Sequence, residues 1–187
     1  MQNELIEKIN GLLENKEFII VAIDGRCGSG KTTLAERLKN YFNCNVIHMD
    51  DFFLRREQRN EERLSIPGEN VDHERFLEEV LKPISKNGEC SYRPFNCKDM
   101  QLGDVTTIKK CHVTIIEGSY TCHDKLYGYY DLRVFCDVNK AEQLKRLKMR
   151  EGEEKLKVFC EKWIPLEEVY FDKFNIKEKC EIVINMN

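Results

Sequence analysis

Several absences narrow what this sequence can encode. Its nine cysteines include no C-x-x-C pair, so neither a zinc knuckle nor a dithiol redox motif is supported. No apolar run approaches the ~20 residues of a membrane helix. The net charge is −3, and no basic block indicates a nucleic-acid partner. The first residues, from Met1 to Glu7, carry acids and no long apolar stretch, unlike a secretory signal.

These absences favour a cytoplasmic protein with reduced thiols, no membrane partner and no nucleic-acid partner. They leave open whether the chain forms a homo-oligomer. A length of 187 residues, without an internal repeat or low-complexity segment, predicts a single domain over residues 1–187.

Short apolar runs alternate with helical patterns along the chain. This alternation predicts an α/β fold with a doubly wound, mostly parallel five-stranded sheet. The expected strands are residues 18–23, 44–49, 112–116, 132–137 and 181–185. The expected helices are residues 31–42, residues 140–150, a helix capped by Asp72, and an N-terminal helix with Leu5, Ile9, Leu12 and Leu13 on one face.

Two stretches are less regular. The segment from Leu54 to Asn70 is highly charged and ends after Pro67 and Gly68, which predicts an exposed loop. Residues 90–107 are weakly patterned and are expected to form a hairpin or an irregular insertion.

A glycine-rich run follows the first expected strand and precedes a helical pattern. The run consists of Gly25, Arg26, Cys27, Gly28, Ser29, Gly30, Lys31, Thr32 and Thr33. It matches the pattern G-x-x-x-x-G-K-S/T at every fixed position, and both flanks argue against a chance match on a glycine-rich turn. Backbone N–H groups and a helix N-terminus in this arrangement cradle phosphates. The run therefore predicts a P-loop NTPase that binds ATP, with Lys31 at the β/γ-phosphates and Thr32 on Mg²⁺.

Acids follow two other expected strands. Asp50 and Asp51 come directly after residues 44–49, and Glu117 ends the strand at 112–116. Ligands of such sheets bind beyond the carboxyl ends of the strands, so Asp50, Glu117 and the P-loop are expected to converge. We interpret Asp50 as the base that accepts a hydroxyl proton and Glu117 as a Walker-B-type acid, with both near the magnesium ion. For Asp51, capping of the following turn is favoured.

Two further features have a functional and an ordinary explanation. Arg146 and Arg150 share a helix face and could clamp phosphate oxygens, although charged helix faces are common. Cys27 lies near Lys31 and a helix N-terminus, which would lower a thiol pKa, but a tolerated variable position is favoured. The run Asn139-Lys140-Ala141-Glu142 nearly matches a guanine-reading motif; without any D-x-x-G, it is better read as a helix start.

Together these features resemble the uridine kinase/phosphoribulokinase family of P-loop kinases, from about residue 19 to 171. Asp50-Asp51-Phe52-Phe53 is similar to the family segment D-S/D-F-Y/F, and Asn70-Val71-Asp72-His73 is similar to N-F/W-D-H. Glu117-Gly118 and the pair Arg146 and Arg150 match the family's E-G segment and its lid arginines. The resemblance implies a base at Asp50, hydroxyl binding at Asp72, and further acceptor contacts at Phe53, Arg93 and Phe95.

The chain departs from the family pattern where the family reads a base. Val71 replaces the aromatic residue before the binding Asp. Arg93-Pro94-Phe95-Asn96-Cys97 matches P-x-Y-D-F only loosely, and the histidine that follows in the family is absent. The hydroxyl-binding and phosphate-handling parts are kept, so the phosphoryl-transfer prediction is firmer than the uridine prediction.

The resemblance implies ATP- and Mg²⁺-dependent phosphoryl transfer to a hydroxyl of a small metabolite. A uridine or cytidine type of nucleoside is the first acceptor to consider. A sugar, pantothenate or glycerate type of acceptor, or an ATP-binding regulatory switch, remains the alternative. We expect an acceptor-binding insertion at about 54–107 and a lid at about 146–163. Trp163 could line the acceptor pocket, but a core position is more usual for a lone aromatic residue.

Overall fold

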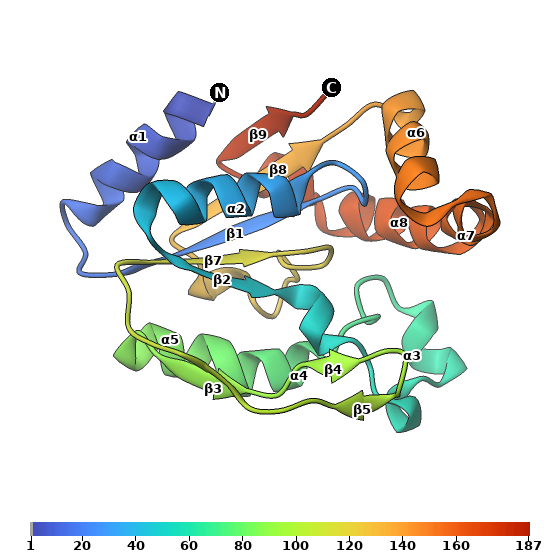
Figure 1. Ribbon diagram of the computed structural model, residues 1–187, viewed down its shortest axis with the longest axis horizontal. Helices are drawn as coiled ribbons and strands as arrows, with labels where there is room; N and C mark the ends of the chain where they lie inside the picture. The colour runs from blue at the N-terminus through green and yellow to red at the C-terminus, as the bar shows by residue number, and fades with distance from the viewer. Residues whose placement is uncertain (1) are drawn as a thin grey trace.

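A five-stranded parallel sheet lies at the centre of the protein, as expected from the sequence (Figure 1). The computed structural model describes residues 2–187. In sheet order the strands are β2 (Asn45–His48), β7 (Val113–Glu117), β1 (Ile19–Gly25), β8 (Leu132–Asp137) and β9 (Ile182–Asn185).

The central position of β1 follows from its sequence. Every residue of this strand is buried, as a β-branched, apolar run requires when helices cover both faces of a sheet. Its register pairs Ile23 with Glu117 of β7 and Gly25 with Cys136 of β8. All five strands run in the same direction, so the P-loop and Glu117 emerge at the same edge.

Helices cover both faces of the sheet. On one face, Leu5 and Ile9 of α1 pack with Leu34 and Leu38 of α2 against β1, β7 and β8. This confirms the amphipathic N-terminal helix. Large aromatic and aliphatic side chains, including Phe76 and residues of α8, fill the other face. The helices named here are α1 (Gln2–Leu13), α2 (Lys31–Phe42), α4 (His73–Phe76), η3 (Leu77–Leu81), α5 (Lys82–Asn87), α8 (Ile164–Phe174) and α9 (Ile176–Lys179).

The stretch between β8 and α8 is almost entirely helical. Asn139 caps the first of these helices by accepting a hydrogen bond from the Glu142 N–H, which confirms that Asn139-Lys140-Ala141-Glu142 is a helix start. The helices are α6 (Lys140–Glu151), α7 (Glu153–Val158) and the π-helical turn η5 (Phe159–Trp163), which runs directly into α8.

The segment from Leu54 to Asn70 is exposed over much of its middle, as its charge predicts, but it is not a simple loop. It contains two short helices, and Leu54, Glu69 and Asn70 are buried. Two of its polar side chains bond to the next helix and its cap, Gln58 to Asp72 and Arg63 to Glu74. The elements here are η1 (Met49–Phe52), η2 (Arg56–Gln58) and α3 (Glu61–Ser65).

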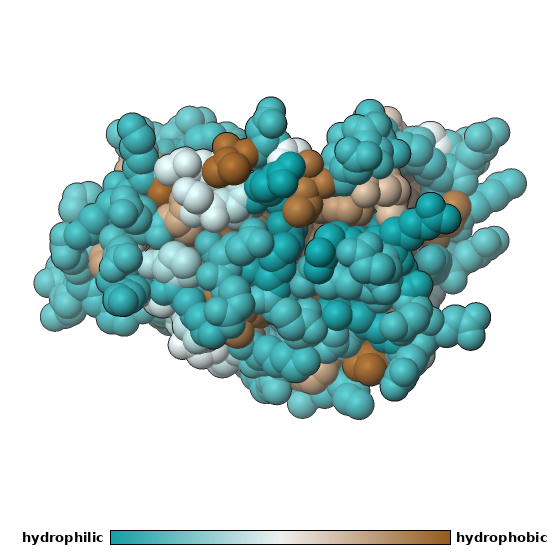
Figure 2. All heavy atoms as spheres, turned by 90° about the horizontal axis from the view of Figure 1, so that it is seen from below, coloured by the Kyte–Doolittle hydropathy of each residue, from teal (hydrophilic) through white to brown (hydrophobic). Residues whose placement is uncertain are grey.

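Residues 90–108 form two small antiparallel pairs, in line with the expected hairpin. The pairs are β3 (Cys90–Tyr92) with β6 (Thr106–Ile108) and β4 (Phe95–Asn96) with β5 (Gln101–Leu102). With α4 and α5 they form the lower part of Figure 1. The molecule seen from below is largely hydrophilic, with apolar side chains exposed only in small groups (Figure 2).

Two expectations from composition also concern the described residues. All nine cysteines are free, and five of them are buried. None of the described helices has the length and apolar character needed to cross a bilayer.

Candidate active site

The P-loop joins β1 to α2 at the centre of the sheet edge. Its glycines have backbone angles that other residues rarely adopt, with φ of +133° at Gly25 and +100° at Gly30. A Cβ on Gly25 would lie 2.1 Å from the Cys136 carbonyl oxygen, so only glycine fits beside β8. The predicted strand, turn and helix of the P-loop are therefore confirmed.

Lys31 folds back over the start of the P-loop. Its Nζ donates hydrogen bonds to the carbonyl oxygens of Gly25, at 2.7 Å, and Arg26, at 3.0 Å. Only 8% of Lys31 is exposed. The two hydrogen-bond partners of this buried ammonium group are neutral carbonyl groups and not carboxylates. The charge of Lys31 is therefore available to phosphate oxygens.

Polar side-chain atoms from α2, β7 and β2 meet near Lys31. Thr32 Oγ1 donates to Glu117 Oε1 at 3.2 Å, and Glu117 Oε1 lies 2.6 Å from His48 Nδ1. This hydrogen bond to Glu117 raises the pKa of His48. Hydroxyl and carboxylate oxygens are the ligands that Mg²⁺ prefers, so Thr32, Glu117 and Asp50 fit a magnesium ion with its waters.

The carboxylate of Asp50 lies in the same cleft. Its side chain is exposed to the cleft, and partial desolvation by the protein around the cleft raises the pKa of Asp50. Repulsion from Glu117 and Asp51 acts in the same direction, whereas Lys31 and His48 oppose it. A divalent cation at this place would relieve the crowding of negative charge.

A cavity of about 520 Å³ lies over the P-loop and is called here the P-loop cavity. It has polar groups at its floor and aromatic rings at its sides. The residues that line it are Cys27, Gly28, Gly30, Lys31, Thr32, Thr33, Asp50, Phe53, Glu117, Gly118, Ser119, Tyr120, Arg146, Arg150, Phe159, Trp163 and Glu167. The predicted phosphate, metal and arginine residues thus surround one space, and the half-buried Trp163 borders it.

A second, more open cavity of about 510 Å³ lies next to it and is called here the hairpin cavity. Its lining comes from η1 and from the β4–β5 hairpin. The residues that line it are Asp50, Asp51, Phe53, Pro94, Phe95, Asn96, Cys97, Lys98 and Gly103. Asp50 and Phe53 border both cavities, so the two spaces meet at the predicted base.

The two predicted lid arginines both border the P-loop cavity but have different partners. Arg146 donates to the carbonyl oxygens of Ser29, at 3.2 Å, and Met186, at 2.6 Å. Arg150 is exposed, and its Nε bonds to Glu151 at 2.9 Å. Arg146 is thus fixed beside the P-loop, while Arg150 lies further out on the same helix face.

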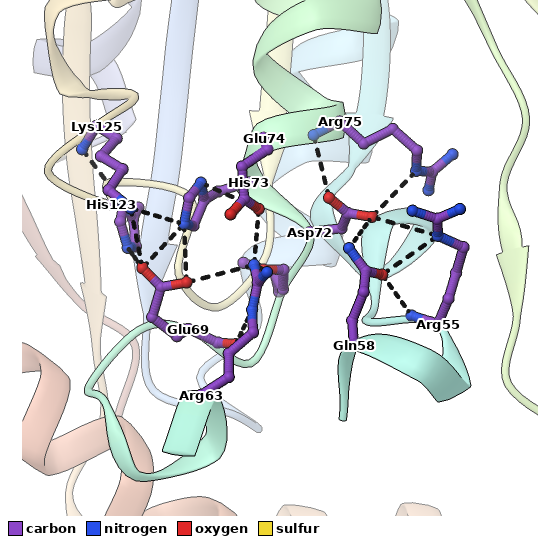
Figure 3. Close-up of polar contacts among 11 residues, drawn as sticks. Arg55, Gln58, Arg63, Glu69, Asp72, His73, Glu74, Arg75, His123 and Lys125 are labelled. Carbon is purple, nitrogen blue, oxygen red and sulfur yellow. Dashed lines mark hydrogen bonds and ion pairs between the residues drawn. The ribbon is translucent and has the colours of Figure 1, made fainter. Parts of the chain in front are cut away.

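Asp72 is not open to either cavity. It caps α4 by accepting from the Arg75 N–H at 3.1 Å, as predicted, and its other oxygen accepts from Gln58 Nε2 at 2.8 Å (Figure 3). Only 2% of Asp72 is exposed. Arg93 is also engaged, because its guanidinium donates to the carbonyl oxygens of Gly103 and Leu102. Of these acceptor residues, the structure brings Phe53 and Phe95 to the hairpin cavity.

A sequence model of the phosphoribulokinase/uridine kinase family matches residues 20–155. The chain belongs to this family. It is a small-molecule kinase of the uridine kinase-like type, as the resemblance predicted.

Two curated relatives are similar to most of this chain. The uridine kinase of Ureaplasma urealyticum serovar 10 is 30% identical over 157 residues, which cover 77% of this chain and 74% of that protein. A bifunctional alpha-galactosidase/sucrose kinase of Mediterraneibacter gnavus is 28% identical over 175 residues, which cover 80% of this chain but 18% of that protein.

Solved structures agree on the fold. A protein described as a possible uridine kinase from Bacillus stearothermophilus superposes with a TM-score of 0.69 at 17% identity, over 97% of this chain and 99% of that chain. YFH7 from Saccharomyces cerevisiae gives a TM-score of 0.70 at 14% identity, over 98% and 97% of the two chains. At these identities the likeness concerns the fold of the kinase alone.

The lowered thiol pKa that the neighbours of Cys27 would favour is not found, in line with the favoured interpretation of Cys27 as a tolerated variable position. Burial raises the pKa of this thiol well above its ordinary value, and the neighbouring Glu167 raises it further. Lys31 and the hydrogen bond from Gln143 act in the opposite direction but are weaker. Cys27 is therefore a protonated, poorly nucleophilic thiol in this kinase.

Sequence reasoning missed several residues of the P-loop cavity. Ser119 and Tyr120 follow Glu117 and Gly118 directly, so their place after a strand was the available signal. Glu167 and Phe159 come from the helical segment beyond the lid arginines, and no local pattern marks them. Arg26 was predicted at the nucleotide, but its guanidinium pairs with Glu168 and Asp137 instead.

A separate polar cluster lies between α4 and the loop after β7 (Figure 3). Glu69 bonds to His73 Nε2 at 2.9 Å and to Lys125 Nζ at 3.1 Å, while His123 stacks on His73 with the ring centres 4.4 Å apart. Glu69, His73 and His123 each bring one possible ligand atom to within 4.8 Å of the others, a spacing that could hold a metal ion. The ammonium of Lys125 lies 3.1 Å from Glu69 Oε1 and 3.3 Å from His73 Nε2, so the described side chains form an ion-pair network at this place.

Proposed function

We propose that this kinase transfers the terminal phosphoryl group of Mg-ATP to a hydroxyl of a small metabolite, with Asp50 as the base. The observation that carries the proposal is the position of Asp50 between the two cavities. A base there can reach a hydroxyl in the hairpin cavity while phosphates occupy the P-loop cavity. Its raised pKa favours proton acceptance from the attacking alcohol.

The residues around Asp50 would hold and orient the phosphates. Lys31 exchanges its two carbonyl partners for the β- and γ-phosphate oxygens, and the P-loop N–H groups bind the same charges. Thr32, Glu117 and Asp50 would hold a magnesium ion and its waters. When bound, the ion neutralises charge that develops on the phosphates.

The arginines and the 54–107 insertion would complete the site. Arg146, already fixed beside Ser29, and Arg150 stabilise charge on the transferring group when residues 146–163 act as a lid. Phe53 and Phe95 offer apolar surface to the acceptor in the hairpin cavity. Asp72 and Arg93 contribute to acceptor binding only if their present partners give way.

A uridine or cytidine type of nucleoside is the acceptor we favour. The family match and the uridine kinase relatives at 27–30% identity support it. A sugar type of acceptor is the second candidate, because the sucrose kinase relative is 28% identical and Val71, Phe95 and Cys97 replace base-reading residues. Both candidates use the same phosphoryl-transfer residues.

The test is ADP formation from Mg-ATP with a panel of uridine, cytidine, sugars, pantothenate and glycerate. Turnover with uridine or cytidine that disappears in Asp50→Ala supports the favoured acceptor. Turnover only with another compound would support the phosphoryl-transfer mechanism but identify a different acceptor. Tight ATP binding without acceptor-stimulated turnover would contradict the proposal and favour a nucleotide-dependent switch.

A further inference from the structure

A carboxylate of the protein itself occupies part of the P-loop. Glu167, on α8, borders the P-loop cavity and is 4% exposed. Its Oε2 accepts a hydrogen bond from the Cys27 N–H at 3.0 Å, and its Oε1 accepts from the Ser119 hydroxyl at 2.5 Å. The Cys27 N–H belongs to the row of backbone donors that gives a P-loop its affinity for phosphate. Glu167 thus places an anionic group in an anion cradle.

Two neighbours of Glu167, Glu168 and Tyr170, also connect α8 to the end of β1 and the start of the P-loop. Glu168 forms a two-pronged pair with the Arg26 guanidinium, at 2.7 and 2.9 Å. Tyr170 donates its hydroxyl to the buried Asp24 at 2.9 Å. Three side chains of α8 therefore hold Asp24, Arg26 and Cys27, which lie next to one another at the end of β1.

The helix that carries Glu167 continues into the expected lid. α7, η5 and α8 form one helical path from Glu153 to Phe174, with helical backbone angles at each junction. The middle of this path is a π-helical turn, Phe159–Trp163, and both terminal rings of that turn border the P-loop cavity. π-helical turns allow one helical register to change without breaking the helix, and they are frequent at functional sites.

We propose that Glu167 is an internal substitute for the terminal phosphate, and that a nucleoside triphosphate displaces it from the Cys27 N–H and thereby moves the lid. Two anions cannot share one N–H donor, and they repel each other strongly in a cavity shielded from water. A diphosphate carries less negative charge and one phosphate group fewer, so it competes less with Glu167. The residue therefore couples the number of phosphates to the position of Phe159 and Trp163. The inference needs nucleotide binding only and does not depend on the acceptor.

The test compares Glu167→Gln with Glu168→Gln, a matched control one residue away that removes the same charge without touching a P-loop N–H. Affinities for a non-hydrolysable ATP analogue and for ADP are measured by calorimetry at fixed Mg²⁺, without an acceptor. In Glu167→Gln we expect the analogue to bind about tenfold more tightly and ADP to change about twofold, because the competing charge is gone. In Glu168→Gln the ratio of the two affinities should stay near that of the wild type. An unchanged ratio in Glu167→Gln, or a shift toward ADP, would overturn the proposal.

A second measurement uses the unaltered protein and so does not depend on the variant folding. Trp163 is the one tryptophan of the chain, and it lies on the π-helical turn beside the cavity. The ATP analogue should change its emission and increase hydrogen exchange in the first turn of α8 more than ADP does. Glu167→Gln without nucleotide should already show the emission of the analogue-bound wild type. Equal responses to the analogue and to ADP would contradict a role for Glu167 in sensing the terminal phosphate.

Discussion

The P-loop cavity and the hairpin cavity meet at Asp50, but they are built in different ways. The P-loop cavity takes many of its polar groups from the segments at the ends of β1, β2 and β7, where the parallel ladder fixes the register and sets His48 opposite Glu117. The hairpin cavity is bordered by β4, which has two residues, by Gly103 just after the equally short β5, and by exposed side chains such as Asn96 and Lys98.

This difference separates two tasks of a kinase. The P-loop and Glu117, to which we assign phosphate and magnesium binding, are held by a buried sheet, so their positions depend on the whole fold. Groups around the hairpin cavity depend on a few local contacts, so they can change without loss of the sheet. One phosphoryl-transfer site can therefore serve several acceptors within one family.

The largest expected difference between the two cavities is the effect on kcat of removing the charge of Asp50 or of Asp51. Asp50→Asn should lower kcat about 10³-fold, because a general base contributes 10² to 10⁴. Asp51 borders only the hairpin cavity and accepts the Tyr92 hydroxyl at 3.0 Å, so Asp51→Asn should lower kcat less than about tenfold. Steady-state kinetics with the acceptor found in the panel measures both, and equal losses would mean that Asp50 is not the base.

A glycine in each region shows how much room its backbone leaves for a side chain. Gly118 has φ +144°, and a Cβ there would lie 2.7 Å from Met49 Cβ. Gly118→Ala should therefore lower the free energy of unfolding by about 3 kcal/mol. At Gly103 of the hairpin cavity a Cβ would make ordinary contact with Pro94, 3.4 Å or more away, so Gly103→Ala should cost less than about 1 kcal/mol. Urea unfolding measures both, and similar losses would contradict the idea that the sheet edge is the more constrained side.

The two regions also differ in how far the sequence predicts them. The sheet, the P-loop, the acids Asp50 and Glu117 and the cap at Asp72 all follow from patterns within a few residues. The contact between Glu167 and Cys27 spans 140 residues, and no local pattern encodes it. That contact and burial together outweigh the neighbouring lysine and raise the pKa of the Cys27 thiol, an effect that the local sequence does not show. The helices between Leu54 and Asn70 were missed because they are only three and five residues long and contact distant residues through Gln58 and Arg63.

The ion-pair network of Glu69, His73 and Lys125 joins the 54–107 insertion to the loop after β7. The protonation of His123, which stacks on His73, provides a test of this network. Burial and the charges of His73 and Lys125 lower the pKa of His123 to about 4, against the opposing effect of Glu69 and Asp124. Below pH 6.5 the unfolded chain gains a proton at this residue that the folded protein does not, so stability falls as the pH drops from about 6.5 toward 4.

His123→Asn removes this proton while keeping an acceptor for the Lys125 N–H. The free energy of unfolding of the wild type, relative to that of the variant, should therefore fall by about 2 kcal/mol between pH 7 and pH 4.5. Urea unfolding at a series of pH values provides the measurement. Parallel pH profiles for the two proteins would show that His123 is not held neutral by the network.

The smallest expected effect concerns the charge at the hairpin cavity. Lys98 is exposed there, and solvent screens a charge in such a place. A nucleoside or a sugar carries no charge, so Lys98→Ala should change the KM for such an acceptor less than about threefold and leave the KM for ATP unaltered. Lys86→Ala, which removes an exposed lysine of α5, is the control. A tenfold rise in the acceptor KM for Lys98→Ala alone would instead indicate an anionic acceptor, such as a carboxylate-bearing alcohol, because only a charged group would depend on this lysine.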